Sequence, residues 1–284
     1  MNIFHAILLG IIQGLTEFLP ISSTAHLTLT GKLLGLIDTN HPETWTAFLA
    51  VIQLGTLAAV LMYFRKDIVA MTMALWNDVV RGARHAGQGG LSRDSLLALY
   101  VCVGTIPVVI IGLLLKDVIE GMFTKSTVVI ATSLIVLALI LWRAEKAAKH
   151  LRTIEQVTLR DALVVGLAQA VALIPGSSRS GTTITAALFL GFSREAAARF
   201  SFLLSIPAVF ASGIYQLLKI HPGVFGLGIL NLVIATLVSW AAGYAAIAWL
   251  LRYLTRHTTM AFVWYRIGLG VFLAALIAAG LLQA

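Results

Sequence analysis

Charged side chains are scarce in this chain of 284 residues: 20 are Lys or Arg and 12 are Asp or Glu, together 11%. A soluble domain has about 25% charged residues. Hydrophobic residues make up 59% of the chain, and the mean hydropathy is +0.95. Because only a bilayer solvates that much apolar surface, these values exclude a soluble globule, a disordered chain and a disulfide scaffold. A polytopic membrane protein remains.

Cysteine is almost absent too, and the single Cys102 excludes an intramolecular disulfide. The N-terminal stretch M-N-I-F-H-A-I-L-L-G lacks the basic region of a cleaved signal peptide. The net charge of +8 is not accompanied by basic residues interleaved with exposed aromatics, the pattern of nucleic-acid binders. We therefore expect membrane lipids, and no nucleic acid, as partners.

Six apolar stretches are long enough, or nearly so, to cross about 30 Å of hydrocarbon. They lie at residues 45–64, 95–115, 126–142, 200–218, 226–251 and 262–282. Two further apolar regions, 3–36 and 162–192, are interrupted at Pro20 and Pro175. Their halves are short for a span and suit re-entrant helical hairpins, although Pro-kinked spans are the alternative. The predicted fold is an all-α polytopic integral membrane protein with six full transmembrane helices and two re-entrant hairpins.

The two broken regions resemble each other. Q-G-L-T-E-F-L-P-I-S-S-T-A-H from Gln13 aligns, with one gap, with Q-A-V-A-L-I-P-G-S-S-R-S-G-T from Gln169. This alignment pairs Ser22 with Ser177 and Ser23 with Ser178. Because three spans follow each hairpin, the halves must have opposite orientations, which predicts an inverted-topology repeat with a binding site between its halves. We expect one membrane domain, 1–284, with a first repeat at 1–142 and a second at 143–284.

The loops predict the orientation of the chain. With both hairpins returning to their own side, 14 Lys and Arg residues fall on one face and four fall on the other. The basic face is therefore expected to be cytoplasmic, with both termini and the mouth of the first hairpin outside. Arg179 and Arg266 remain in or near the membrane. Arg266, beside Trp264 and Tyr265, is expected to snorkel to the cytoplasmic interface.

Polar residues at the first break are functional candidates, because polar groups are costly inside hydrocarbon. Gln13 and Glu17 share one helical face. Their oxygens suit a hard divalent cation, and Glu17 is alternatively a general base. A hydroxyl becomes a nucleophile when a neighbour takes its proton. Three residues with hydroxyl groups, Ser22, Ser23 and Thr24, follow Glu17 within seven positions. His26, the residue type that most often accepts such a proton, comes next.

The second break reads P-G-S-S-R-S-G-T-T. Gly176 and Gly181 allow close approach of backbone to a ligand, and the following half-helix offers free N–H groups. Arg179 adds a planar donor suited to phosphate. This pattern predicts a phosphate cradle that includes Ser177, Ser178, Ser180 and Thr183. Gln53, in the middle of a span, either lines the cavity or bonds to a neighbouring helix.

These motifs resemble those of a known family. The segments at 13–26 and 175–183 look like the two signatures of the bacterial undecaprenyl-diphosphate phosphatases of the bacitracin-resistance type, and similarity at 48–55 and 199–207 extends it over the chain. The resemblance implies hydrolysis of undecaprenyl diphosphate to the lipid monophosphate carrier for cell-wall polymers, in the bacterial plasma (inner) membrane, with the site facing outside. It implicates Glu17, Ser23 and His26 in catalysis, and Ser178, Arg179, Ser180 and Thr183 in binding the diphosphate. It also implies a divalent cation, Mg²⁺ or Ca²⁺.

Several alternatives stay open. Ser23 is the favoured nucleophile with His26 or Glu17 as base, and His26 itself or an activated water are rivals. Arg179, the cation and half-helix N–H groups would offset charge on the transferring phosphoryl group. An inverted-repeat transporter or flippase for a phosphate substrate would use a similar cradle. A homodimer is among the oligomeric states that the sequence allows.

Overall fold

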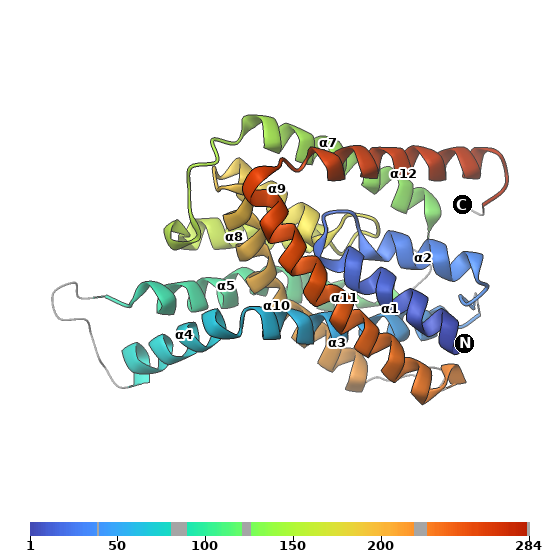
Figure 1. Ribbon diagram of the computed structural model, residues 1–284, viewed down its shortest axis with the longest axis horizontal. Helices are drawn as coiled ribbons and strands as arrows, with labels where there is room; N and C mark the ends of the chain where they lie inside the picture. Colours follow the sequence, from blue (N-terminus) through green and yellow to red (C-terminus); the bar gives the residue numbers. More distant parts are fainter. Residues whose placement is uncertain (39, 81–89, 121–125, 219–225, 283–284) are drawn as a thin grey trace.

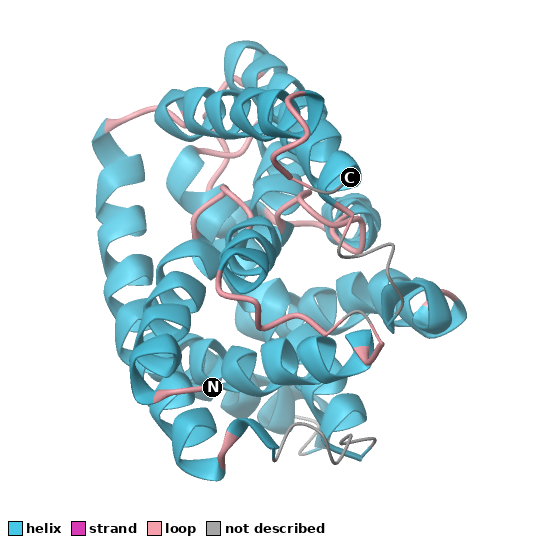
Figure 2. Cartoon of the chain, turned by 90° about the vertical axis from the view of Figure 1, so that its right-hand side faces the viewer, coloured by secondary structure: helices cyan, strands magenta, loops and turns pink. Residues whose placement is uncertain are grey.

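The computed structural model describes every residue except 39, 81–89, 121–125, 219–225 and 283–284. Its described residues form helices and connecting loops, without β-sheet (Figures 1 and 2). The elements are α1 (Ile3–Phe18), α2 (Ser23–Leu33), α3 (Pro42–Tyr63), α4 (Arg65–Leu75), η1 (Trp76–Val80), α5 (Arg93–Leu114), α6 (Lys116–Glu120), α7 (Thr127–Ala147), η3 (Ile154–Gln156), α8 (Leu159–Val171), α9 (Arg179–Phe189), α10 (Arg194–Leu218), α11 (Ile229–Arg256) and α12 (Met260–Ala278).

Six helices are long and apolar enough to cross a membrane: α3, α5, α7, α10, α11 and α12. Their mean hydropathy ranges from 1.5 to 2.5. Large apolar side chains such as Leu114 and Trp264 are exposed on them, as expected where the surrounding solvent is lipid. The predicted number of six spans is confirmed, and the chain is a multi-pass membrane protein.

The two other apolar regions each split into two short helices, as predicted. Region 3–36 breaks between α1 and α2, and region 162–192 breaks between α8 and α9. Ser22 caps α2 with its side chain accepting from the amide of Ala25, and Ser178 caps α9 in the same way from Gly181. Both cap residues have positive φ, 76° and 68°. A positive φ costs conformational free energy in a residue with a Cβ, and residues in this conformation are concentrated at functional sites.

Close helix contacts hold the short helices in place. α1 packs along α11, and α8 packs along α5. A Cβ on Gly10 of α1 would lie 2.5 Å from the carbonyl oxygen of Ala235, and one on Gly166 of α8 would lie 2.1 Å from that of Gly104. α3 also contacts α10, and α7 lies beside α12 (Figure 1). Glycine is therefore required at both crossings, because a side chain there would separate the helices.

The beginning of α1 and the end of α12 lie at the same end of the molecule, on the right of Figure 1. The connection from α7 to α8 lies at the opposite end and is fixed by ion pairs. Arg152 binds Asp161 at 2.5 Å, and Arg194 binds Glu145. Burial would raise the pKa of Asp161, but hydrogen bonds from Arg152 and Thr158 outweigh it and hold the pKa below its usual value.

Candidate active site

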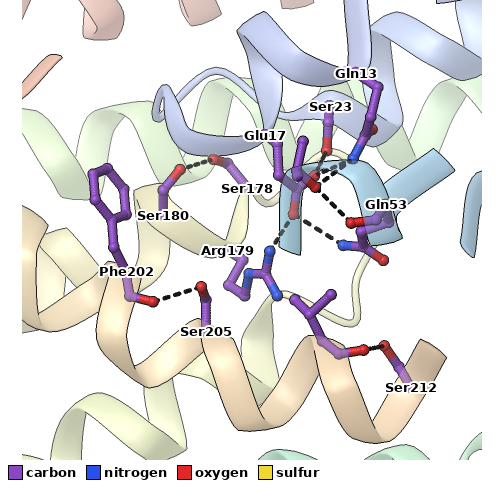
Figure 3. A network of polar contacts seen from close by, with 12 residues as sticks. Gln13, Glu17, Ser23, Gln53, Ser178, Arg179, Ser180, Phe202, Ser205 and Ser212 are labelled. Carbon is purple, nitrogen blue, oxygen red and sulfur yellow. Dashed lines mark hydrogen bonds and ion pairs between the residues drawn. The ribbon is translucent and has the colours of Figure 1, made fainter. Parts of the chain in front are cut away.

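A buried carboxylate lies where the two breaks meet. Glu17 is 6% exposed and accepts four hydrogen bonds (Figure 3). Gln13 Nε2 and Ser23 Oγ donate to Oε2 at 3.0 and 2.7 Å. Gln53 Nε2 donates to Oε1 at 2.9 Å, and the Arg179 guanidinium pairs with the same oxygen. The protein therefore compensates the carboxylate with one cation and three neutral donors.

Ser23 and Arg179 contact Glu17 from equivalent positions at the starts of their helices. Ser23 is the first helical residue after the cap of α2, and Arg179 is the first after the cap of α9. Each approaches a different oxygen of the carboxylate. The hydroxyl of one break and the guanidinium of the other are thus held next to one carboxylate, although they are far apart in sequence.

The second break is pressed against α7. Gly176 has φ +85°, and a Cβ there would lie 2.2 Å from Ser133 Oγ. Ser133 Oγ in turn donates to the carbonyl of Pro175 at 2.5 Å. Gly176 is therefore required by its backbone conformation and by close packing on α7, and it also lines the cavity described below.

Arg266 corrects one expectation. Instead of snorkelling to the interface it is fully buried, at 0% exposure. Its guanidinium donates to carbonyl oxygens of both breaks, Pro20 at 3.4 Å, Gly176 at 3.3 Å and Ser177 at 3.0 Å. It also donates to the carbonyl of Ser133 at 3.4 Å. The two terminal nitrogens of the planar guanidinium make these contacts, so Arg266 fastens the two breaks to each other and to α7.

A cavity of 290 Å³ opens beside Glu17. It is lined by eight of the predicted site residues: Glu17, Ser22, Ser23, Thr24, Gln53, Gly176, Ser178 and Arg179. Its apolar wall includes Val108, Leu173 and Ala208. The sequence suggested two roles for Gln53, and it has both: it lines the cavity, and its amide donates a hydrogen bond to Glu17 of α1. The N-terminal ends of α2 and α9 thus meet a polar hollow large enough for phosphate groups.

Other predicted residues lie around this cavity without being among its lining residues. Gln13 supports Glu17 and approaches Thr56 at 3.4 Å. Ser180 Oγ donates to the carbonyl of Leu19 at 3.0 Å and so links the two breaks. Thr183 bonds to Ser201 of α10 at 2.6 Å. Ser177 is fully buried, and its carbonyl accepts from Arg266. These contacts indicate that Ser180 and Thr183 hold the breaks in position.

Both ring nitrogens of His26 contact groups other than Glu17. Its Nδ1 lies 2.7 Å from the carbonyl oxygen of Ser22, and its Nε2 lies 2.6 Å from the hydroxyl of Tyr265. Because a carbonyl only accepts, Nδ1 carries a proton, and in a neutral ring Nε2 accepts from Tyr265. The ring also stacks on Tyr265. Ser23 Oγ thus donates to Glu17, while both ring nitrogens of His26 contact other groups.

The oxygen ligands for a cation are few. The described residues hold no cluster of three or more His, Cys, Asp or Glu side chains. At the cavity Glu17 is joined by the amides of Gln13 and Gln53 and by hydroxyls. This set fits a Mg²⁺-like ion that takes one carboxylate from the protein and further oxygens from a bound phosphate.

The fold and the site together define a multi-pass membrane protein with a carboxylate, a hydroxyl and a guanidinium gathered in a polar cavity between two broken helices. The chain belongs to the bacitracin resistance protein BacA family, which it matches over residues 6–272.

Curated relatives are similar in sequence to this chain over nearly its full length. A protein of Syntrophobacter fumaroxidans is 53% identical over 271 residues, covering 95% of both chains. One of Chloroherpeton thalassium is 52% identical, covering 100% of both. One of Myxococcus xanthus is 51% identical, covering 100% of this chain and 92% of the relative. Each of these relatives is named undecaprenyl-diphosphatase.

The sequence did not single out Tyr265, Arg266 or Gln169 as site residues. A charged residue within an apolar span was a usable signal for Arg266. The alignment with Gln13 was one for Gln169, which lines the cavity.

Proposed function

We propose that this protein hydrolyses undecaprenyl diphosphate to undecaprenyl phosphate and inorganic phosphate. The observation that carries the proposal is the hydrogen bond of 2.7 Å from Ser23 Oγ to Glu17, whose other oxygen pairs with Arg179. A hydroxyl beside a base and a guanidinium is suited to phosphoryl transfer, where positioning and electrostatics dominate. The names of the curated relatives support the same reaction.

The arrangement supports a serine mechanism in two steps. Ser23 Oγ attacks the terminal phosphorus as its proton passes to Glu17, and the bridging P–O bond breaks to release undecaprenyl phosphate. Glu17 passes this proton to the departing lipid phosphate and is a carboxylate again. Water then attacks the phosphoserine as Glu17 takes one of its protons, the Oγ–P bond breaks, Glu17 returns the proton to Ser23 Oγ, and inorganic phosphate leaves. Direct attack by water activated by Glu17 is the rival, and phosphate trapped on Ser23 during turnover distinguishes the two.

Arg179 has two binding partners in this scheme, Glu17 and the terminal phosphate. It pairs with Glu17 in the free protein, and the same guanidinium suits the terminal phosphate. Transfer of Arg179 from the carboxylate to the phosphate would free the Oε1 oxygen of Glu17 when substrate is present. His26, held by Ser22 and Tyr265, is assigned a role in orienting the first break.

A divalent cation, Mg²⁺ or Ca²⁺, is part of the proposal. Glu17 and Gln13 would hold it, together with oxygens of the diphosphate. When bound, it would neutralise charge on the transferring phosphoryl group.

The prenyl tail has a path beside the cavity. An apolar groove of 180 Å³ is lined by α5 and α10 residues that include Val109, Gly112, Leu113 and Ala211. Val108, Leu173 and Ala208 line both the groove and the cavity. We assign the groove to the first part of the polyprenyl tail, since an apolar chain joined to a diphosphate requires such a continuous surface.

An inverted-topology repeat with two re-entrant hairpins accounts for the packing. It relates 1–142 to 143–284 and exchanges α1 with α8 and α11 with α5, which pack in matching pairs. The helix caps favour pairing Ser22 with Ser178, one residue along from the alignment suggested by the sequence. This register makes Ser23 the counterpart of Arg179.

The proposed orientation places the termini and the cavity mouth on the periplasmic or external side of the bacterial plasma membrane. The basic ion-paired end, with Arg152 and Arg194, then faces the cytoplasm, following the positive-inside rule. A homodimer is compatible with this placement.

The test is phosphate release from undecaprenyl diphosphate by the purified protein in detergent, with and without a chelator. We expect release that stops with chelator and returns with Mg²⁺ or Ca²⁺. Because transport cannot occur in detergent, substrate binding without any release would overturn the hydrolase and favour a carrier.

A further inference from the structure

Gln169 of α8 is a buried amide without a partner. It is 0% exposed, and neither its Oε1 nor its Nε2 has a hydrogen-bond partner among the described residues. Burying an amide in this way costs free energy. The same side chain lines the cavity that contains Glu17 and Arg179. An amide that is unsatisfied in the free protein and borders the reaction cavity is suited to bind what enters it.

Its counterpart Gln13 behaves differently. Each glutamine follows, by three residues, a glycine that packs against the backbone of a crossing helix: Gly10 before Gln13 and Gly166 before Gln169. Gln13 donates to Glu17 at 3.0 Å, whereas no carboxylate takes that place for Gln169 among the described residues. Both halves carry a glutamine at this position. Among the described residues, the Gln13 amide forms hydrogen bonds and the Gln169 amide forms none.

The position of Gln169 indicates which part of the substrate would lie beside it. Leu173, four residues further along, lines both the polar cavity and the apolar groove. Ser23 and Arg179 lie at Glu17, on the carboxylate side. A lipid diphosphate with its terminal phosphorus at Ser23 and its tail in the groove must pass its inner phosphate between these two places.

We propose that Gln169 Nε2 donates a hydrogen bond to the inner phosphate of the lipid diphosphate, the phosphate that stays on the lipid. This inference rests on the proposed function. It makes Gln169 a substrate-binding residue that distinguishes a prenyl phosphate from inorganic phosphate. Arg179 and Ser23 act instead on the phosphate that leaves.

The test compares Gln169→Leu with Gln13→Leu and the wild type. We expect Gln169→Leu to keep or raise the melting temperature, because it replaces an unsatisfied amide with an apolar group of similar size. Its kcat/KM for phosphate release should fall about 10- to 100-fold. Gln13→Leu should lower the melting temperature, because it removes a bond to Glu17.

Product inhibition gives the decisive readout. In Gln169→Leu, inhibition by farnesyl phosphate should weaken about tenfold or more, while inhibition by inorganic phosphate stays as in the wild type. Gln169→Met, which is unbranched, provides the same measurement if the Leu protein does not fold.

Three results would overturn the assignment: a melting temperature that falls as for Gln13→Leu, unchanged kcat/KM, or weakened inhibition by inorganic phosphate in place of farnesyl phosphate. A wild-type protein that releases no phosphate would refute the proposed function itself, and is therefore a separate outcome.

Discussion

Replacing Glu17 by Gln changes the charge at the centre of the site and almost nothing of its shape. The carboxylate accepts bonds from Gln13, Ser23, Gln53 and Arg179. An amide offers one acceptor oxygen and adds two donors, so about half of these contacts are lost. Each hydrogen bond to a charged group contributes about 1.5–3 kcal/mol. Because Arg179 has a side chain that is 17% exposed and can turn to the cavity, we expect a loss of about 3 kcal/mol in unfolding free energy.

Activity should fall further than stability. Loss of a positioned general base lowers kcat by about 10²- to 10⁴-fold. The assay is phosphate release from undecaprenyl diphosphate at saturating substrate, using protein shown to be folded by its melting curve. Gln53→Leu is the matched control, since it removes one bond to Glu17 and keeps the carboxylate. We expect it to retain kcat within about tenfold.

A folded Glu17→Gln protein with kcat within about tenfold of the wild type would refute the base assignment. In that case Ser23 would need another proton acceptor.

Three further changes test the architecture. Arg266→Met should lower the unfolding free energy by about 3–5 kcal/mol, because it leaves buried carbonyls unsatisfied; an unchanged melting temperature would contradict the fastening role. Gly176→Ala should destabilise far more than Gly35→Ala, since both have positive φ but nothing lies within 4 Å of a Cβ at Gly35; equal melting temperatures would refute the packing argument. The lowered pKa of Asp161 predicts stability that is present above about pH 4 and lost as the pH falls through the folded-state pKa. Asp161→Asn should flatten that acid limb of the melting temperature.

The number of spans was predictable because hydrophobic length is a local property. Their ends were less so. The helix predicted over 200–218 begins at Arg194, and the one predicted over 126–142 continues to Ala147. The additional turns carry charged residues, Arg194 and Glu145, which pair with each other. Hydropathy counts each as a polar residue in isolation, whereas the fold neutralises them together.

The candidate site was partly predictable for a related reason. Each break carries a compact motif, and the structure brings Glu17, Ser23 and Arg179 into contact. The roles assigned to them stay predictions. The partners contributed by distant segments, such as Tyr265 beside His26, depend on packing between helices that no local pattern encodes.

The rate of phosphate release by Ser23→Ala, measured beside the wild type in detergent with undecaprenyl diphosphate and Mg²⁺, tests the central claim most directly. Ser23 Oγ is the attacking atom in this account, and removing a nucleophile that acts together with its base costs at least about 10³-fold. We predict a loss of that size in a protein that its melting curve shows to be folded. A folded Ser23→Ala protein that releases phosphate at a near wild-type rate would contradict the account.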